Sequence, residues 1–229
     1  MVYFNEERFS RFILEQNVIG FGKPKRLSSG KTSHWYVNWR RITDDAFLTE
    51  KLIDFIIDLV CDLDFKPSSF YGVPEGATKL GALTTFEWAK RSPNYGIGSH
   101  VLSMGRKEPK RHGDEPDRYF IGIPRGKTIV LEDVTTTGES LLKKGLSYVK
   151  DHASNAQLIA TLTLTTRMTP LQKDEFSTKV LEDYGIQAYA MSDALQLLPE
   201  AYQRQKPGEH IGALVEEELA QEGVIIKLR

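Results

Sequence analysis

Two adjacent carboxylates stand at the end of an apolar run near the middle of this chain. The run covers residues 128–131, and Glu132 and Asp133 follow it directly. Acids at the end of a buried strand are costly unless a cation or a hydroxyl-bearing group meets them. Carboxylates accept hydrogen bonds from sugar hydroxyls, and they can hold a hydrated Mg²⁺. The pair therefore indicates a site for a sugar or for a metal-bound ligand at this strand end.

The stretch after the acids, residues 135–140, is rich in hydroxyl groups and leads into a helix that we expect to open at Ser140. The first N–H groups of a helix lack internal partners and lie at the positive end of its dipole, which suits a phosphate. Gly138 allows the backbone to approach a ligand closely. Alternatively, Thr136 and Glu139 form a capping box that only starts the helix. Together, acids and phosphate turn indicate a phosphorylated sugar.

Residues 130–138, VLEDVTTTG, resemble the phosphoribosyl-pyrophosphate (PRPP) signature of the type I phosphoribosyltransferases. This resemblance implies that the acids hold the ribose hydroxyls and that the turn holds the 5′-phosphate. It also implies that Mg²⁺ is held mainly through PRPP, with Asp133 as a candidate ligand through water. The PRPP contacts implied by this match are Glu132, Asp133, Val134, Thr135, Thr136, Thr137, Gly138, Glu139 and Ser140.

An earlier strand, turn and helix start, within residues 69–77, resembles the loop that holds diphosphate in the same family. Gly76 is its expected PRPP contact, and some members of the family carry lysine at this position. Glu75 is unusual there, because a carboxylate beside a diphosphate should repel it unless Mg²⁺ lies between them.

A charged, glycine-flanked segment follows at residues 105–118. A run of charges is most often a solvated face. Here the spacing Arg-Lys-Glu-x-Lys-x-His resembles the catalytic loop of the orotate phosphoribosyltransferases, which closes over the diphosphate and excludes water. The resemblance implies catalytic roles for Arg106, Lys107, Lys110 and His112, together with Asp133.

The aromatic segment near the N-terminus, residues 29–38, resembles the part of orotate phosphoribosyltransferases that contributes to the pyrimidine site. The family usually has lysine where this chain has Ser28, which puts one cation contact in doubt. An arginine that faces the base in the family matches Arg167, although its usual acidic predecessor is Thr166 here. The alternative is ordinary sheet aromatics and a surface arginine. The orotate contacts implied are Tyr36, Val37, Thr137 and Arg167.

The hydrophobic periods predict alternating strands and helices. We expect helices at 4–17, 44–62, 77–88, 141–150, 171–184, from 193 and at 211–221, and strands at 69–73, 101–104, 127–130, 158–165, 186–191 and 224–226. An aromatic hairpin is expected before residue 40. This order predicts an α/β fold with a central, mainly parallel sheet flanked by helices and with ligand loops at the strand ends. The resemblance adds a type I phosphoribosyltransferase-like arrangement: one domain over residues 1–229, with a small hood from about residues 1–40 and C-terminal elements.

Composition is ordinary for a globular protein, with 40% hydrophobic and 27% charged residues and a net charge of −1. The charge gives no reason to expect nucleic acid or membrane as a partner. No run approaches the roughly 20 apolar residues of a membrane span, and residues 2–7 do not resemble a signal peptide, so a cytoplasmic protein is expected. The single cysteine, Cys61, is expected to be a buried structural thiol, and no Cys/His cluster has zinc-ligand spacing.

The resemblance as a whole implies an orotate phosphoribosyltransferase of pyrimidine biosynthesis. Such a transferase joins orotate to PRPP with Mg²⁺ and commonly works as a homodimer whose subunits share the basic loop. One alternative is a phosphoribosyltransferase for another base, as in purine salvage, which would not explain the aromatic segment or the basic loop. The other is a PRPP-sensing regulator, which would require a basic face or an added module for nucleic acid.

Overall fold

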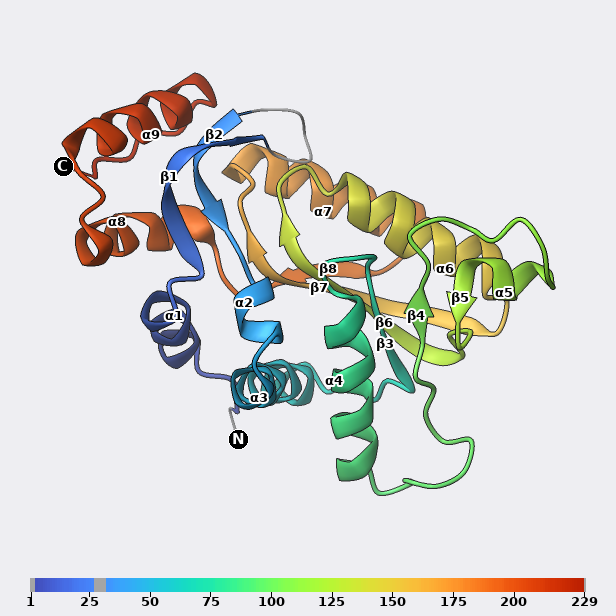
Figure 1. Ribbon diagram of the computed structural model, residues 1–229. Coiled ribbons are helices and arrows are strands. Elements are labelled where there is room, and N and C mark those ends of the chain that lie inside the picture. The colour runs from blue at the N-terminus through green and yellow to red at the C-terminus, as the bar shows by residue number, and fades with distance from the viewer. Residues whose placement is uncertain (1–2, 27–31, 229) are drawn as a thin grey trace.

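A six-stranded sheet forms the centre of the molecule in the computed structural model, which describes residues 3–26 and 32–228 (Figure 1). Neighbouring strands are parallel except β4 and β5, which are antiparallel. In spatial order the strands are β5 (Phe120–Ile121), β4 (Met104–Gly105), β3 (Ser69–Gly72), β6 (Gly126–Thr135), β7 (Ala156–Thr166) and β8 (Gln187–Ala190). The expected mainly parallel sheet is confirmed.

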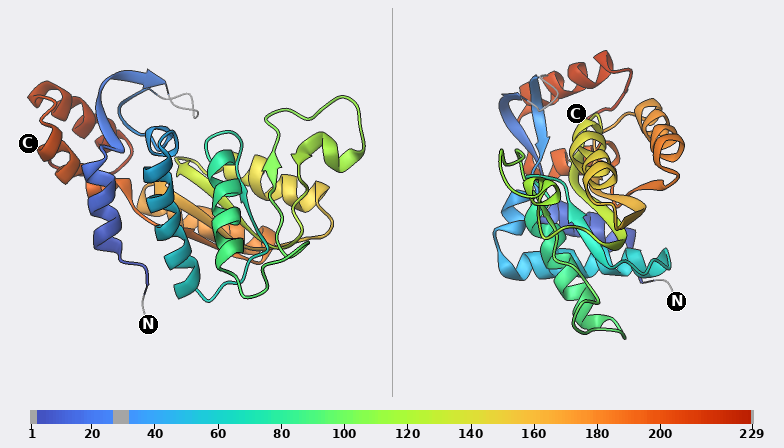
Figure 2. Two further views of the ribbon diagram at one scale, coloured as in Figure 1. Left: turned by 60° about the horizontal axis from the view of Figure 1, so that its bottom comes forward. Right: turned by 90° about the vertical axis from the view of Figure 1, so that its right-hand side faces the viewer.

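Helices cover both faces of this sheet (Figure 2). Alternate residues of β6 show the two layers: Ile129 and Leu131 belong to one hydrophobic cluster and Val130 to the other, as the two-residue repeat of a strand requires. The first cluster includes side chains of α1 (Glu6–Glu15), α3 (Ala46–Asp62), α4 (Thr78–Arg91) and α8 (Ala194–Gln205). The second includes side chains of the π-helical turn η1 (Leu141–Leu146), α6 (Ser147–His152) and α7 (Pro170–Tyr184). Both faces of the sheet are therefore buried.

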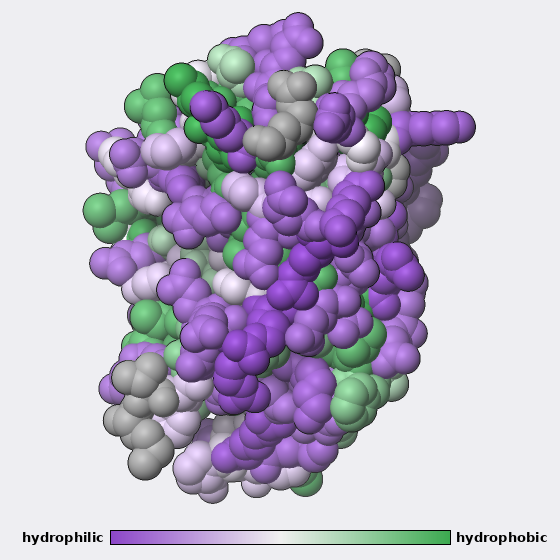
Figure 3. All heavy atoms as spheres, turned by 90° about the vertical axis from the view of Figure 1, so that its left-hand side faces the viewer, coloured by the Kyte–Doolittle hydropathy of each residue, from purple (hydrophilic) through white to green (hydrophobic). Residues whose placement is uncertain are grey.

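A separate antiparallel hairpin, β1 (Ile19–Arg26) and β2 (Thr32–Val37), forms the hood. It lies beside α8 and α9 (Glu209–Gln221), so the two ends of the chain build one structure (Figure 1). Phe21 and Tyr202 meet edge to face at 5.6 Å, and Gln205 Nε2 donates to the Ile19 carbonyl at 2.6 Å. The surface on this side of the molecule is mainly hydrophilic (Figure 3). The hood predicted from the aromatic segment is present.

Two short helices were not predicted: α2 (Arg40–Thr43) and α5 (Glu115–Tyr119). The predicted terminal strand at residues 224–226 is wrong. The backbone beyond it is bound by side chains instead of by a strand: Leu228 N donates to Glu216 Oε1 at 2.8 Å, and Gln203 Nε2 donates to the Leu228 carbonyl at 2.9 Å. An apolar run supplies the pattern of a strand, but a strand also needs a neighbour to pair with.

Candidate active site

The acid pair lies inside β6, which continues to Thr135 and is longer than the sequence predicted. Glu132 is 5% exposed, and its Oε1 accepts a hydrogen bond from the Asp133 N–H at 3.2 Å. Burial, followed by the neighbouring Asp133, raises the pKa of Glu132 well above its usual range. Asp133 is half-buried and its Oδ1 accepts from the Val134 N–H at 2.9 Å. The site therefore offers one carboxyl that favours its protonated form beside a second carboxyl that lines the cavity.

A cavity of about 540 Å³ opens over this strand end. The hood contributes one wall, the loop after β3 a second, and the acid pair with the following turn a third. The predicted ligand residues that line it are Tyr36, Val37, Gly76, Glu132, Asp133, Val134, Thr136, Ser140 and Arg167; Asn38, Arg40, Pro74 and Glu75 complete it. Residues spread over more than a hundred positions of sequence thus share one surface.

Four predicted contacts lie in the same segment without lining this cavity. Thr135 is buried, and its carbonyl accepts from the Arg167 N–H at 2.8 Å. Thr137 is exposed, and its Oγ1 accepts from the Glu139 N–H at 3.4 Å. Gly138 has φ +74°, and a Cβ there would lie 2.3 Å from the Phe176 ring, so only glycine fits.

The capping-box alternative for the turn does not hold. The Glu139 side chain pairs with Lys143, one turn further along the helix, and not with Thr136. Ser140 makes no side-chain cap at the start of η1. The turn is therefore shaped by Thr137 and Gly138, and its hydroxyl groups are not used up in starting a helix.

The diphosphate-type loop touches the acid pair directly. A Cβ on Gly76 would lie 2.5 Å from Asp133 Oδ2 and 2.6 Å from Oδ1. A side chain at this position, such as the lysine of some family members, would have to displace the Asp133 carboxylate. Asp133 can therefore hold its observed position only because residue 76 has no side chain.

Arg167 follows the end of β7 and is only 7% exposed, so the surface-arginine alternative is wrong. Its guanidinium carbon lies 3.7 Å from the centre of the Trp35 ring, and Nη2 donates to Ser33 Oγ at 3.1 Å. Burial lowers its pKa to about 10, with Glu218 and Glu222 acting in the opposite direction. Nε has no hydrogen-bond partner, and no ion pair between described residues includes Arg167. A charged guanidinium with unused donors therefore faces the cavity, as binding of a carboxylate or carbonyl requires.

The hood places its aromatic residues differently from one another. Tyr36 lines the cavity and packs over Gly20, where a Cβ would lie 2.5 Å from its ring. Gly20 lies within β1, where the lack of a side chain makes room for Tyr36. Trp39 is a core residue whose Nε1 donates to Thr165 Oγ1 at 3.1 Å. Ser28, where the chain departs from the family, and the matching residues Ser29, Gly30 and Lys31 lie outside the described residues.

The basic loop reaches this chain's own cavity at one point. Lys107 Nζ lies 3.3 Å from Glu75 Oε2, so the unusual acid of the diphosphate-type loop is paired with a predicted catalytic cation. Arg106 Nε donates to the Asp117 carbonyl at 3.2 Å. Lys110 and His112 are exposed and do not line the cavity, and the loop projects from the edge of the sheet (Figure 2). The predicted catalytic cations are therefore not all gathered at the site of their own chain.

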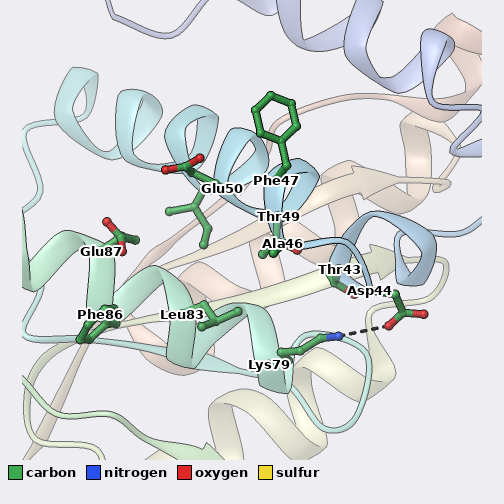
Figure 4. Close-up of a pocket in the computed structure, with 11 residues that line it drawn as sticks. Thr43, Asp44, Ala46, Phe47, Thr49, Glu50, Lys79, Leu83, Phe86 and Glu87 are labelled. Atoms are coloured by element: carbon green, nitrogen blue, oxygen red, sulfur yellow. Dashed lines mark hydrogen bonds and ion pairs between the residues drawn. The ribbon is translucent and has the colours of Figure 1, made fainter.

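A larger cavity, of about 630 Å³, lies between α3 and α4 (Figure 4). Its walls include Phe47, Leu83 and Phe86, and an ion pair of 3.1 Å joins Lys79 Nζ to Asp44 Oδ1 at one end. None of the predicted ligand residues lines it. The smaller cavity at the strand ends is therefore the candidate active site.

Neither a metal cluster nor a membrane helix occurs in the part of the chain that the structure describes. Across residues 3–26 and 32–228, no three or more His, Cys, Asp or Glu side chains are grouped as they would be to hold a metal. Over the same residues, no helix combines the length and apolar character that crossing a bilayer requires. Cys61 is half-buried, and burial raises the pKa of its thiol.

Known structures share this fold. The chain superposes on the orotate phosphoribosyltransferase of Mycobacterium tuberculosis H37Rv in complex with PRPP with a TM-score of 0.56 at 18% identity, covering 84% of this chain and 98% of the other. At this identity the likeness shows the fold, which is that of a type I phosphoribosyltransferase.

Sequence relatives identify the family more closely, although no family model matches the chain. It is 31% identical over 144 residues to the orotate phosphoribosyltransferase of Aquifex aeolicus, covering 62% of this chain and 75% of that protein. It is 32% identical over 145 residues to the orotate phosphoribosyltransferase of Bradyrhizobium diazoefficiens, covering 59% and 71%. The chain belongs to the orotate phosphoribosyltransferase family.

Proposed function

We propose that this protein transfers the phosphoribosyl group of PRPP to orotate, giving orotidine 5′-monophosphate and diphosphate in pyrimidine biosynthesis. The observation that carries the proposal is the 540 Å³ cavity, in which a buried guanidinium, an acid pair and a phosphate-type turn line one surface. Family membership and the PRPP-bound structural neighbour support it. The composition supports a cytoplasmic location as part of the same proposal.

The reaction separates charge. As the bond between ribose C1 and diphosphate breaks, positive charge develops on the ribose and negative charge on the diphosphate. Glu132 and Asp133 would hold the ribose hydroxyls, and the turn from Thr135 to Ser140 would hold the 5′-phosphate through hydroxyl and N–H groups. No covalent bond to the protein is needed, because positioning and charge stabilisation supply the catalysis.

Oxygen ligands of the site fit Mg²⁺. The Asp133 carboxylate lies against Gly76, so a hard oxygen ligand stands beside the diphosphate-type loop. Asp133 would hold the ion through water, with PRPP as its main ligand. Mg²⁺, when bound, supplies positive charge where the diphosphate gains negative charge. Lys107 would add to that charge once it leaves Glu75 for a diphosphate, in its own subunit or in the partner.

Arg167 would hold the orotate carboxylate, with Tyr36 and Val37 of the hood and Thr137 beside the base. A guanidinium stacked on Trp35 has a restricted orientation, so its donors are directed before the ligand arrives. This arrangement supports a base with an acidic substituent over a purine.

The protein would act as a homodimer in which the loop of one subunit completes the site of the other. Lys110 and His112 are exposed on a projecting loop and do not line their own chain's cavity, which supports this part of the proposal. Gly113, with φ +104° and open space around it, gives the loop backbone freedom, whereas Gly105 is buried in β4 against Tyr71.

Incubation with PRPP, Mg²⁺ and orotate tests the proposal, with loss of orotate absorbance as the readout. Conversion that depends on all three components is expected. Consumption of hypoxanthine or guanine with orotate inert would assign the protein to another base. Binding of PRPP without conversion of any base would support the regulator instead.

A further inference from the structure

A second cavity, of about 410 Å³, adjoins the first on the side of the hood and α9. The two cavities share Thr136 and Arg167. The remaining described lining comes from the hood, with Thr32 and Trp35, and from α9, with Glu218, Gln221 and Glu222. Arg167 is thus reached from two compartments, and α9, in which the sequence predicted no ligand residue, forms part of the second.

Opposite charges line this second cavity without forming an ion pair with one another. Arg167 and Glu218 are both on its surface, yet no ion pair joins them. Glu218 is fixed in place, because its Oε2 accepts from the His34 N–H at 3.1 Å and lies 3.8 Å from His34 Nδ1. The Glu218 side chain is only 19% exposed. A held carboxylate and a buried cation therefore remain separated in one cavity.

Such a cavity suits the base and not the phosphates. The carboxylate of Glu218 would repel a diphosphate or a 5′-phosphate, whereas the first cavity offers hydroxyls and a phosphate-type turn. A carboxylate accepts hydrogen bonds from ring N–H groups, and a guanidinium donates to carboxylates and carbonyls. The ligand that fits has an acidic group at one end and an N–H donor at the other.

Orotate has this form. Its carboxylate is on C6, and N3, which carries an N–H, lies directly across the ring from C6. N1 loses its hydrogen when it bonds to ribose, so N3–H is the ring donor that remains throughout the reaction. A base held at its C6 carboxylate by Arg167 presents N3–H on the far side, where a fixed acceptor is useful.

We infer that Glu218 is a specificity-determining residue of the base site, accepting a hydrogen bond from orotate N3–H while Arg167 holds the carboxylate. The inference rests on the proposed function. It adds to that function a residue of α9 that discriminates bases by their N3–H group. A site built to accept an N–H rejects an analogue that lacks it, because the acceptor is then left unpaired.

Kinetics of Glu218→Gln test the inference, with Glu217→Gln as the matched control on the exposed side of the same helix. Glutamine keeps an oxygen that can accept from the His34 N–H, so the hood should stay docked. We expect the KM for orotate to rise about tenfold in Glu218→Gln, because hydrogen bonds to charged groups are the stronger ones, while the KM for PRPP stays unchanged. Glu217→Gln should match the wild type in both constants.

A second measurement uses 3-methylorotate, which lacks the N3–H. The wild type should prefer orotate strongly, and Glu218→Gln should narrow that preference, which a merely structural role of Glu218 would not do. The wild-type ratio needs no variant, so equal use of both bases would overturn the inference even where Glu218→Gln fails to fold. Equal use of both bases by the wild type, or a KM for orotate in Glu218→Gln that is unchanged or lowered, overturns the inference and leaves the proposed function intact. A wild type that converts no orotate overturns both.

Discussion

Glu132 combines deep burial with an acidic neighbour, and both keep its proton bound. The folded state therefore binds this proton more tightly than the unfolded chain, whose glutamates titrate near 4.5. Stability is then lost as the pH rises above 4.5, until the raised pKa of the folded state is passed. At pH values above 4.5, burial of the Glu132 carboxyl therefore lowers the free energy of unfolding.

Replacing Glu132 with glutamine should therefore raise the melting temperature at pH 8, since the amide keeps the acceptor for the Asp133 N–H and removes the ionisable group. The gain should shrink as the pH approaches 4.5, where wild-type Glu132 is protonated in both states. Thermal denaturation of the wild type and of Glu132→Gln between pH 4.5 and pH 8 measures this gain in melting temperature. A gain that is constant with pH would show that titration of Glu132 is not its source.

Asp133→Ala should weaken PRPP binding strongly with little loss of melting temperature, because this carboxylate lines the cavity and not the core. Gly76→Ala should also weaken binding, because its Cβ would push against the Asp133 oxygens. In the Asp133→Ala background, Gly76→Ala should reduce the affinity for PRPP much less. Titration calorimetry with PRPP measures all four proteins. A large fall in melting temperature with intact affinity would assign Asp133 a structural role.

At the scale of elements, the loop after β3 and the basic loop meet through Glu75 and Lys107. Both side chains are 62% exposed, so the pair contributes little to stability and can exchange partners readily. Glu75 thus pairs with Lys107, a cation that the diphosphate would otherwise bind. The two loops are coupled before any ligand binds.

Lys107→Ala should lower kcat about a hundredfold with a smaller change in KM, because the diphosphate gains negative charge mainly in the transition state. Lys127→Ala, an exposed lysine at the other end of β6, is the matched control and should behave as the wild type. Steady-state kinetics with PRPP varied provide both constants. A rise in KM at unchanged kcat would instead mean that Lys107 only binds substrate.

At the scale of the whole molecule, one chain presents a pocket and a basic loop that meets it through the Lys107–Glu75 pair, while Lys110 and His112 do not line that pocket. If two subunits share loops, mixing Lys107→Ala with Asp133→Ala should restore activity, because one hybrid site then combines an intact loop with an intact acid pair. Activity after subunit exchange, confirmed by mass spectrometry of differently tagged chains, measures this. Exchanged dimers without recovery would place the action of Lys107 within its own chain.

Much of the local structure follows from sequence alone. The helix expected at residues 44–62 is present as α3, and the Asp45 side chain caps it by accepting from the Leu48 N–H. The strand that leads to the acid pair was also predicted, although it continues through the pair to Thr135. Such features depend on hydrogen bonds within a few residues and on the period of apolar side chains, both of which a sequence carries directly.

Tertiary structure decided the features that depend on distant partners. Arg167 is a buried cation and not a surface residue because Ser33 and Trp35, far earlier in the chain, receive its guanidinium. From sequence alone Glu75 is an unfavourable charge beside a diphosphate site, and only the tertiary structure shows that Lys107 pairs with it. Residues 224–226 have the apolar pattern of a strand but no strand to pair with. The burial of a side chain, its ion pairs and its pKa depend on residues that are close in space, and the sequence shows only which residues are close along the chain.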